Sequence, residues 1–218
     1  MQFPERFAEL PPYAFPRLRA LLDGHAPGGE PLAMSIGEPR HPMPEMVAPI
    51  LAEEVAGFSR YPANEGTPAH LDAITGWLAR RYGVTVDHDR ILALNGTREG
   101  LYSAAMALCP EAKGGARPAV LMPNPFYQVY AVAALSVGAE PVYLPATGQT
   151  GHLPDLDAIP GETLSRAAIF YLCSPSNPQG AVADEGYWRH LLDLAERWDF
   201  RIFADECYSE IYRDAPPP

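Results

Sequence analysis

The sequence is poor in positive charge and contains no long apolar run. Its 16 lysines and arginines stand against 27 aspartates and glutamates, so the net charge is −11 over 218 residues. This balance argues against nucleic acid as a partner, because phosphates require a basic face, and equally against an anionic membrane surface. No apolar run approaches the roughly 20 residues that span a bilayer, so we expect no membrane partner.

Cysteines and histidines are too few and too scattered for a disulfide framework or a metal site. Cys109, Cys173 and Cys207 form no CxxC pair, and the six histidines have no ligand spacing to one another or to a cysteine. We therefore expect no metal and a reducing, cytoplasmic location. The first residues also lack the charged-then-apolar pattern of a signal peptide.

Several catalytic motifs are absent as well. The sequence has no GxGxxG and no GxxxxGK[ST], which ranks a nucleotide-binding α/β protein low, and no GxSxG elbow of a serine hydrolase. Lysine occurs once, at Lys113. A mechanism that needs an amine nucleophile therefore has a single candidate within these residues.

Short apolar runs alternate with helical patterns over most of the chain. Helical patterns cover about 97–108, 126–137 and 184–198, and the strand-like runs are 91–94, 119–122, 140–144, 167–172 and 200–204. This alternation predicts an α/β fold with a mostly parallel sheet covered by helices on both faces.

The part of the chain before this alternation has a different character. Residues 1–44 are proline-rich and weakly periodic, with a short helix near Leu18 and a small extended segment at 32–36. Two amphipathic helices follow, and the second is bounded by Thr67 as N-cap and Gly83 as C-cap. We expect 1–44 to form an N-terminal arm and part of a small domain, and 45–218 to form the large ligand-binding domain.

Polar or aromatic segments follow four of the predicted strands, at 95–99, 123–127, 174–180 and 205–208. In open α/β sheets, ligands bind at the carboxyl ends of the strands. Gly96 and Thr97 form either a simple turn or a turn that binds an anion. Tyr127 is either a core residue or a surface on which a ligand stacks, and Asn177 either belongs to a rigid turn or contacts a ligand. Asp205 is the strongest candidate, because a carboxylate directly after an apolar strand is costly unless it has a partner.

Taken together, these segments resemble the fold type I, class I/II pyridoxal-phosphate aminotransferases. The resemblance is closest to the subgroup that acts on succinyldiaminopimelate in lysine biosynthesis, and it extends from about Phe15 to Tyr212. It lies in residues 35–39, 61–66, 95–101, 123–130, 173–180 and 203–212. The segments that begin at 173 and 203 are specific when they occur together, and the others support them.

The resemblance implies that pyridoxal 5′-phosphate is the cofactor. The backbone N–H groups of Gly96, Thr97 and Arg98 would hold its phosphate. Tyr127 would stack on the pyridine ring. The substrates would be an amino acid and a 2-oxo acid, with N-succinyl-L,L-diaminopimelate and 2-oxoglutarate as the first choice and another amino donor as the alternative.

The resemblance also implies roles for residues around the ring and the substrate. Asn177 and Tyr208 would hydrogen-bond the ring hydroxyl oxygen, and Asp205 would keep the ring nitrogen protonated, so Asp205 and Tyr208 are the expected catalytic residues. Gly37 would lie beside the substrate carboxylate. Tyr61 would reach the phosphate of a neighbouring subunit, which implies a homodimer.

In one respect the chain departs from the family. In the family, the lysine that forms the Schiff base with the cofactor lies well beyond the aspartate that corresponds to Asp205. In this sequence, Lys113 precedes Asp205. Lys113 lies in a glycine-rich connection, which we expect at the opposite edge of the sheet. We therefore expect these 218 residues to be the N-terminal part of an aminotransferase, incomplete at the C-terminus and inactive alone. A non-catalytic module is the alternative.

Overall fold

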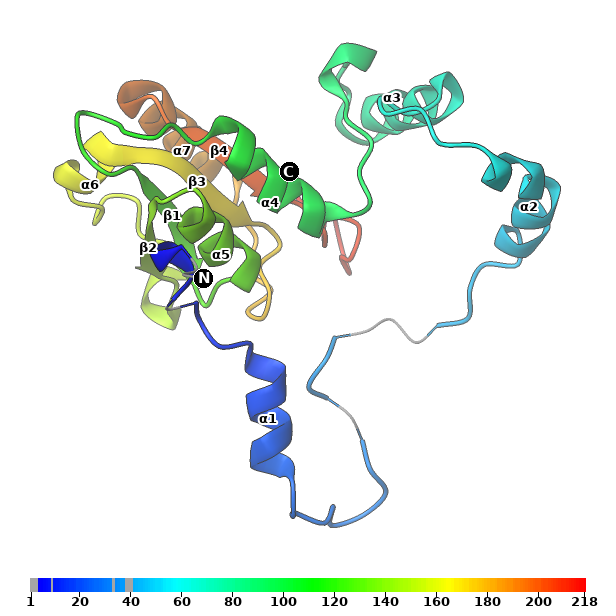
Figure 1. Ribbon diagram of the computed structural model, residues 1–218, viewed down its shortest axis with the longest axis horizontal. Helices are drawn as coiled ribbons and strands as arrows, with labels where there is room; N and C mark the ends of the chain where they lie inside the picture. The colour runs from blue at the N-terminus through cyan, green and yellow to red at the C-terminus, as the bar shows by residue number, and fades with distance from the viewer. Residues whose placement is uncertain (1–3, 9, 33, 38–40) are drawn as a thin grey trace. The chain divides into compact units, whose positions relative to one another are not determined.

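The computed structural model describes residues 4–8, 10–32, 34–37 and 41–218 (Figure 1). The chain divides into two compact units, one made of Met1–Arg17 with Leu94–Pro218 and the other of Leu18–Ala93. This division does not follow the expected boundary between residues 44 and 45, and the assignment of 1–44 and 45–218 to two domains stays a prediction.

A four-stranded parallel sheet forms the centre of the first unit. Its strands lie in the order β2-β1-β3-β4, and their bounds are Ala119–Asn124 (β1), Glu140–Pro145 (β2), Ala167–Cys173 (β3) and Arg201–Asp205 (β4). The central strands β1 and β3 are almost entirely buried, which explains their continuous apolar sequence. The predicted parallel sheet is confirmed.

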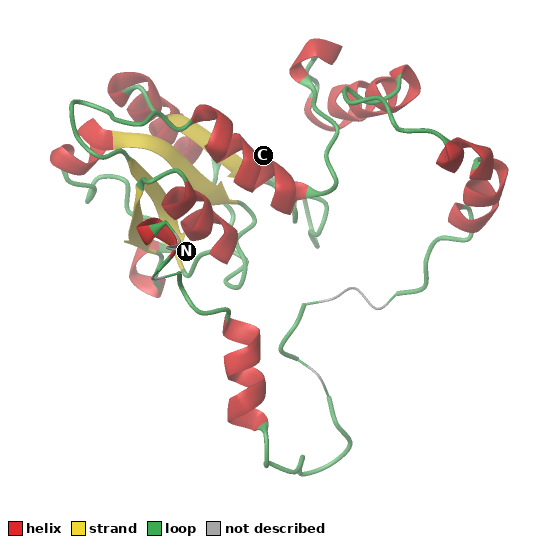
Figure 2. Cartoon of the chain, in the orientation of Figure 1, coloured by secondary structure: helices red, strands yellow, loops and turns green. Residues whose placement is uncertain are grey.

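Helices cover both faces of this sheet (Figure 2). They are α4 (Thr97–Leu108), α5 (Gln128–Ser136), α6 (Gly161–Arg166) and α7 (Glu185–Trp198). Because side chains alternate across a strand, Phe170 of β3 packs in a core with α6 and α7, whereas Tyr171 packs in a second core with α4 and α5. The predicted two-sided covering is confirmed, although the sequence did not reveal the short helix α6.

The predicted strand at 91–94 is wrong. Ile91 has an extended backbone, with φ −118° and ψ 133°, yet none of the four residues belongs to a strand of the described chain. A strand is stable only when a neighbour accepts and donates its ladder hydrogen bonds. The described residues place no strand beside this segment, so its apolar side chains stay largely exposed, as at Leu92 and Leu94.

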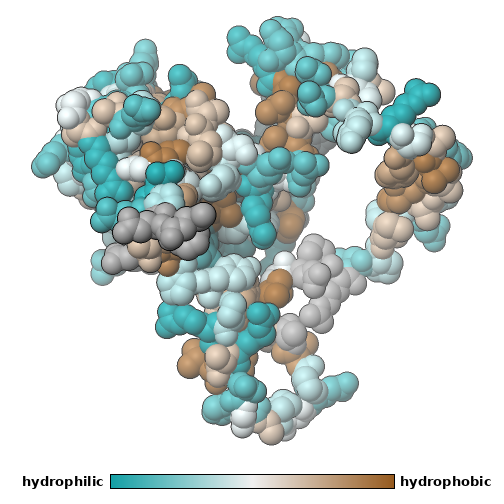
Figure 3. Space-filling model, in the orientation of Figure 1, coloured by the Kyte–Doolittle hydropathy of each residue, from teal (hydrophilic) through white to brown (hydrophobic). Residues whose placement is uncertain are grey.

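The described residues of the second unit form helices and no strand. They are α2 (Val47–Glu53), a 3₁₀ helix at Val55–Ser59, α3 (Pro68–Tyr82) and a 3₁₀ helix at His88–Arg90. The predicted caps of α3 are confirmed: the Thr67 side chain accepts a hydrogen bond from the backbone of His70 at 3.3 Å, and Gly83 has a φ of +67°. Apolar side chains are exposed over α2 and the 3₁₀ helix after it (Figure 3).

A 3₁₀ helix at Glu5–Phe7 and α1 at Ala14–Leu22 precede these elements in the sequence. The small extended segment expected at 32–36 forms no strand in its described residues, and Ala33 lies outside them. In the described part of the chain, no helix combines the length and the apolar character that a bilayer span requires.

Candidate active site

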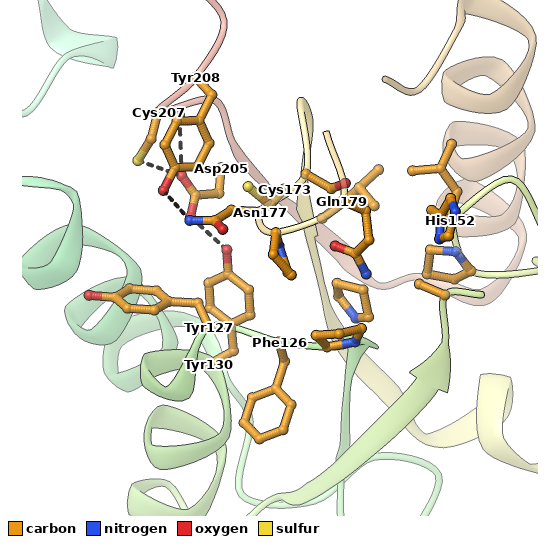
Figure 4. Close-up of a pocket in the computed structure, with 18 of the residues that line it drawn as sticks. Phe126, Tyr127, Tyr130, His152, Cys173, Asn177, Gln179, Asp205, Cys207 and Tyr208 are labelled. Atoms are coloured by element: carbon orange, nitrogen blue, oxygen red, sulfur yellow. Dashed lines mark hydrogen bonds between the residues drawn. The ribbon is translucent and has the colours of Figure 1, made fainter. Parts of the chain in front are cut away.

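A cavity of about 630 Å³ opens at the carboxyl ends of the strands. This volume is in the range of small-molecule sites. Each of the four predicted segments contributes to its wall, and Thr97 comes from the first of them. Tyr127, Asn177, Asp205 and Tyr208 come from the other three and are labelled in Figure 4. The structure therefore brings together side chains that are up to 111 positions apart in the sequence. Those that follow β1, β3 and β4 meet because these parallel strands end at one edge, and Thr97 joins them at the start of α4.

Asp205 is the last residue of β4 and is only 6% exposed. The Tyr130 hydroxyl donates a hydrogen bond to its Oδ2 at 2.6 Å, and the Cys207 thiol donates one to its Oδ1 at 2.8 Å. The main chain of Asp205 is also fixed, because its carbonyl accepts a hydrogen bond from the backbone N–H of Ser174 at 3.1 Å. The partner expected for this buried carboxylate is thus a pair of neutral hydrogen-bond donors.

Tyr130 holds its position through aromatic packing. Its ring stacks on Tyr171 with 4.4 Å between centroids and 9° between planes, and both side chains are buried. Burial, followed by the hydrogen bond to Asp205, raises the pKa of Tyr130, so this hydroxyl remains a donor. Tyr130 is not among the site residues predicted from the sequence. The signal was its place three residues after Tyr127, in a helix whose inner face is rich in alanine.

Asn177 and Tyr208 form a second polar pair on the cavity wall. The Asn177 amide Nδ2 donates a hydrogen bond to the Tyr208 hydroxyl at 2.7 Å (Figure 4). The loop that carries Asn177 is fixed by Ser176, whose backbone N–H donates to the Ala181 carbonyl at 2.8 Å and whose hydroxyl accepts from the Ala181 N–H at 3.0 Å. The pair that the resemblance assigned to one ring oxygen is therefore adjacent in the structure.

The turn at 96–98 forms the N-terminus of α4. Gly96 occupies the N-cap with a φ of +116°, a conformation that favours glycine, and provides no side-chain cap to the first turn. Free N–H groups at a helix start attract anions, and the helix dipole adds to this attraction. The Thr97 hydroxyl lies 3.3 Å from the sulfur of Cys207, the residue whose thiol donates to Asp205, so the start of α4 is next to the buried carboxylate.

Arg98 and Tyr127 are joined on the outer side of this turn. The Arg98 Nε donates a hydrogen bond to the Tyr127 hydroxyl at 2.9 Å, and this bond raises the pKa of the Arg98 guanidinium. The Tyr127 ring also meets the edge of Tyr130, with 5.6 Å between centroids and 89° between planes. These two contacts fix the tilt of an aromatic ring that is 39% exposed beside the cavity.

Two of the predicted site residues belong to the other compact unit. Gly37 and Tyr61 both belong to Leu18–Ala93, the second compact unit, and the Tyr61 side chain is fully exposed. Glu38 and Pro39, which complete the motif around Gly37, lie outside the described residues. The roles of Gly37 and Tyr61 stay predictions.

Lys113 lies at the opposite edge of the sheet from the cavity. It precedes the amino end of β1, and its ammonium donates hydrogen bonds to the carbonyls of Asp199 and, at 2.8 Å, Trp198. These carbonyls end α7, just before β4 begins. Lys113 therefore does not face the candidate site, as its sequence position predicted, whereas its hydrogen bonds to a helix C-terminus were not predicted.

Residues 30–218 match the family model described as aminotransferase class I and II. The chain belongs to this family. An LL-diaminopimelate aminotransferase of Desulforudis audaxviator is 36% identical over 218 residues, and the match covers 98% of this chain and 54% of the relative. The enzyme of the same name from Moorella thermoacetica is also 36% identical, with coverage of 98% and 55%.

A crystal structure of an aminotransferase from Neisseria meningitidis superimposes on this fold with a TM-score of 0.90 and 37% sequence identity. That match covers 98% of this chain and 55% of the other chain. The predicted family and fold are confirmed, and the chain spans about half the length of the curated relatives it matches. Enzymes of this family depend on pyridoxal 5′-phosphate.

Proposed function

We propose that the cavity binds pyridoxal 5′-phosphate and that the protein transfers an amino group between an amino acid and a 2-oxo acid. The observation that carries this proposal is the position of Asp205. The Cys207 sulfur lies 2.8 Å from the Asp205 carboxylate and 3.3 Å from the Thr97 hydroxyl of the helix turn, so the carboxylate and the turn are close together. A compact ligand with a phosphate at one end and a basic nitrogen at the other can therefore reach both groups.

The residues present suit such a ligand. The uncapped first turn of α4 would bind the phosphate through the N–H groups of Gly96, Thr97 and Arg98. Tyr127, held by Arg98, would cover a face of the ring. The Asn177 amide and the Tyr208 hydroxyl would bind the ring hydroxyl oxygen.

Asp205 would face the ring nitrogen and hold a proton there. A negative charge at contact favours the protonated form of a base by ~1–3 pKa units, equivalent to about 1.4–4 kcal/mol. When bound, pyridoxal phosphate supplies an electron sink for the electrons released when the substrate loses its α-hydrogen. Asp205 strengthens that sink by keeping the ring positively charged. Burial at 6% exposure makes its charge more effective than it would be in water.

For the substrate, we propose an amino donor with the diaminopimelate skeleton and 2-oxoglutarate as acceptor. The two relatives described above are named for LL-diaminopimelate, without the succinyl group of the substrate expected from the resemblance. We therefore rank free L,L-diaminopimelate before its N-succinyl derivative. The proposed positions of Gly37 at the substrate carboxylate and of Tyr61 at a neighbouring subunit's phosphate, in a homodimer, belong to the same proposal.

The test uses the protein expressed from its complete gene. With pyridoxal phosphate bound, the protein should absorb visible light, lose that band on addition of L,L-diaminopimelate, and regain it with 2-oxoglutarate. N-succinyl-L,L-diaminopimelate, aspartate and tyrosine, added separately, identify the donor class. A protein that binds the cofactor but shows no spectral response to any amino donor would refute the transferase activity and favour a non-catalytic module.

A further inference from the structure

Cys207 occupies a place in the cavity that the proposed function leaves without a role. Its sulfur lies 2.8 Å from Asp205 Oδ1 and 3.3 Å from the Thr97 hydroxyl oxygen, and its backbone N–H is 3.4 Å from the same Oδ1. The thiol is thus in contact with both the helix turn and the buried carboxylate, and Figure 4 shows it beside Asp205.

The direction of these hydrogen bonds follows from the number of hydrogens. A thiol has one hydrogen, and a carboxylate can only accept, so the Cys207 S–H is directed to Asp205. The contact to Thr97 must then use the threonine hydrogen, with the sulfur as acceptor. Cys207 as a residue is exposed, but desolvation at its sulfur, and next the hydrogen bond to Asp205, raise the pKa of its thiol, so it keeps its hydrogen at neutral pH.

Both oxygens of Asp205 therefore receive a hydrogen from a neutral donor, Oδ1 from Cys207 and Oδ2 from Tyr130. Hydrogen bonds to a carboxylate stabilise its charged form over the protonated acid. This matters because Asp205 and the ring nitrogen would compete for one proton. Each donor that stabilises the carboxylate leaves that proton on the ring.

We propose that Cys207 is a positioning residue for the reaction, because its thiol orients Asp205 as a carboxylate and thereby favours the proton on the cofactor's ring nitrogen. This inference rests on the proposed function, because it requires a pyridine ring in the cavity. Through Thr97, the same thiol links the carboxylate to the turn that would bind the phosphate, so both ends of the ligand would be aligned by one side chain.

The other two cysteines do not share these contacts. The buried Cys173 thiol donates to the Pro175 carbonyl at 3.2 Å, and Cys109 follows the end of α4, outside the cavity wall. Cys109→Ala is therefore a matched control that removes a thiol without touching Asp205.

The experiment uses pyridoxamine 5′-phosphate labelled with ¹⁵N in the ring, bound to the protein expressed from its complete gene. This probe carries an amine in place of the aldehyde, so its binding needs no covalent bond to a lysine. The ¹⁵N chemical shift reports whether the ring nitrogen is protonated, and a pH titration gives its proton affinity. In the unmodified protein we expect a protonated ring nitrogen at neutral pH.

In Cys207→Ala, the proton affinity of the ring nitrogen should fall about threefold to tenfold, the effect expected of a weak donor to a charged acceptor. Cys207→Ser, which restores a donor, should recover most of it, and Cys109→Ala should leave it unchanged. If Cys207→Ala does not fold, Cys207→Val removes the hydrogen while keeping the bulk.

Two negative outcomes are distinguishable. If the unmodified protein binds the probe with a protonated ring and Cys207→Ala or Cys207→Val titrates like Cys109→Ala, the role of Cys207 is refuted while the proposed function stands. If the unmodified protein does not bind the probe, the proposed function itself fails, and the role of Cys207 fails with it.

Discussion

Replacing Tyr130 by phenylalanine isolates one hydrogen bond of the Asp205 network. The change removes the hydroxyl that donates to Oδ2 at 2.6 Å and keeps the ring that stacks on Tyr171 at 4.4 Å. Asp205 is 6% exposed, so water has little access to replace the lost donor. The effect should therefore come from the carboxylate and not from a change in core volume.

The loss of stability expected for Tyr130→Phe follows from the charge of the Asp205 carboxylate, which accepts the hydrogen bond. A hydrogen bond to a charged group contributes about 1.5–3 kcal/mol to stability, whereas one between neutral groups contributes about 0.5–1.5 kcal/mol. For a chain of 150–250 residues, each kcal/mol lowers Tm by about 2–4 °C, so Tyr130→Phe should lower Tm by about 3–12 °C. The ring nitrogen of bound pyridoxamine phosphate should also lose proton affinity.

Tyr171→Phe is the matched control for this measurement. Tyr171 is equally buried, and its hydroxyl donates to a neutral acceptor, the Leu101 carbonyl, at 2.7 Å. Thermal unfolding of both variants should show the larger loss for Tyr130→Phe, and only this variant should change the titration of the bound probe. Equal losses in Tm, together with an unchanged titration, would show that Tyr130 acts only as a core residue.

Three further predictions follow from individual side chains. Asp205→Asn should retain bound cofactor but lose nearly all transamination in the complete enzyme, and near-normal turnover would refute its role at the ring nitrogen. Lys113→Met should lower the free energy of unfolding by about 1–2 kcal/mol, because it removes the donor to the Trp198 and Asp199 carbonyls, and should leave binding of pyridoxamine phosphate unchanged. A stoichiometric borohydride-trapped cofactor adduct at Lys113 would contradict this assignment. Burial raises the pKa of the Cys173 thiol from its ordinary value near 9 to about 12, so the folded state keeps a proton that the unfolded state releases. The contribution of this thiol to the free energy of unfolding should be complete below about pH 9 and lost as the pH rises towards 12. Measured by urea unfolding over this pH range, the free energy of unfolding should fall less steeply for Cys173→Ala than for the unmodified protein. Parallel declines in the two proteins would count against the assignment.

The elements that the sequence predicted well are those with local signals. The caps at Thr67 and Gly83 bound α3 because a side-chain oxygen and a glycine satisfy the helix ends without help from the rest of the fold. The strands β1 and β3 were recognisable from continuous apolar runs, since both are buried on two faces. The segment at 91–94 has the same composition but lacks a pairing neighbour in the described chain, and composition alone cannot reveal that.

The position of the candidate site was predictable from the sequence, but the hydrogen bonds within it were not. Parallel strands place their carboxyl ends together, so the grouping of Tyr127, Asn177 and Asp205 at the ends of β1, β3 and β4 follows from the order of elements. Thr97 lines the same cavity although the segment before it forms no strand. The hydrogen bond between Tyr130 and Asp205 joins residues 75 positions apart and depends on how α5 packs on the sheet. The Cys207 contacts depend on the turn after β4, for which the sequence carries no periodic signal.

The most direct test of the central claim is a crystal structure of the protein, expressed from its complete gene, with pyridoxamine 5′-phosphate bound. The proposed function predicts the phosphate at the backbone N–H groups of residues 96–98 and the ring nitrogen within hydrogen-bond distance of Asp205. A ligand bound elsewhere, or bound in this cavity with its ring nitrogen directed away from Asp205, would contradict it.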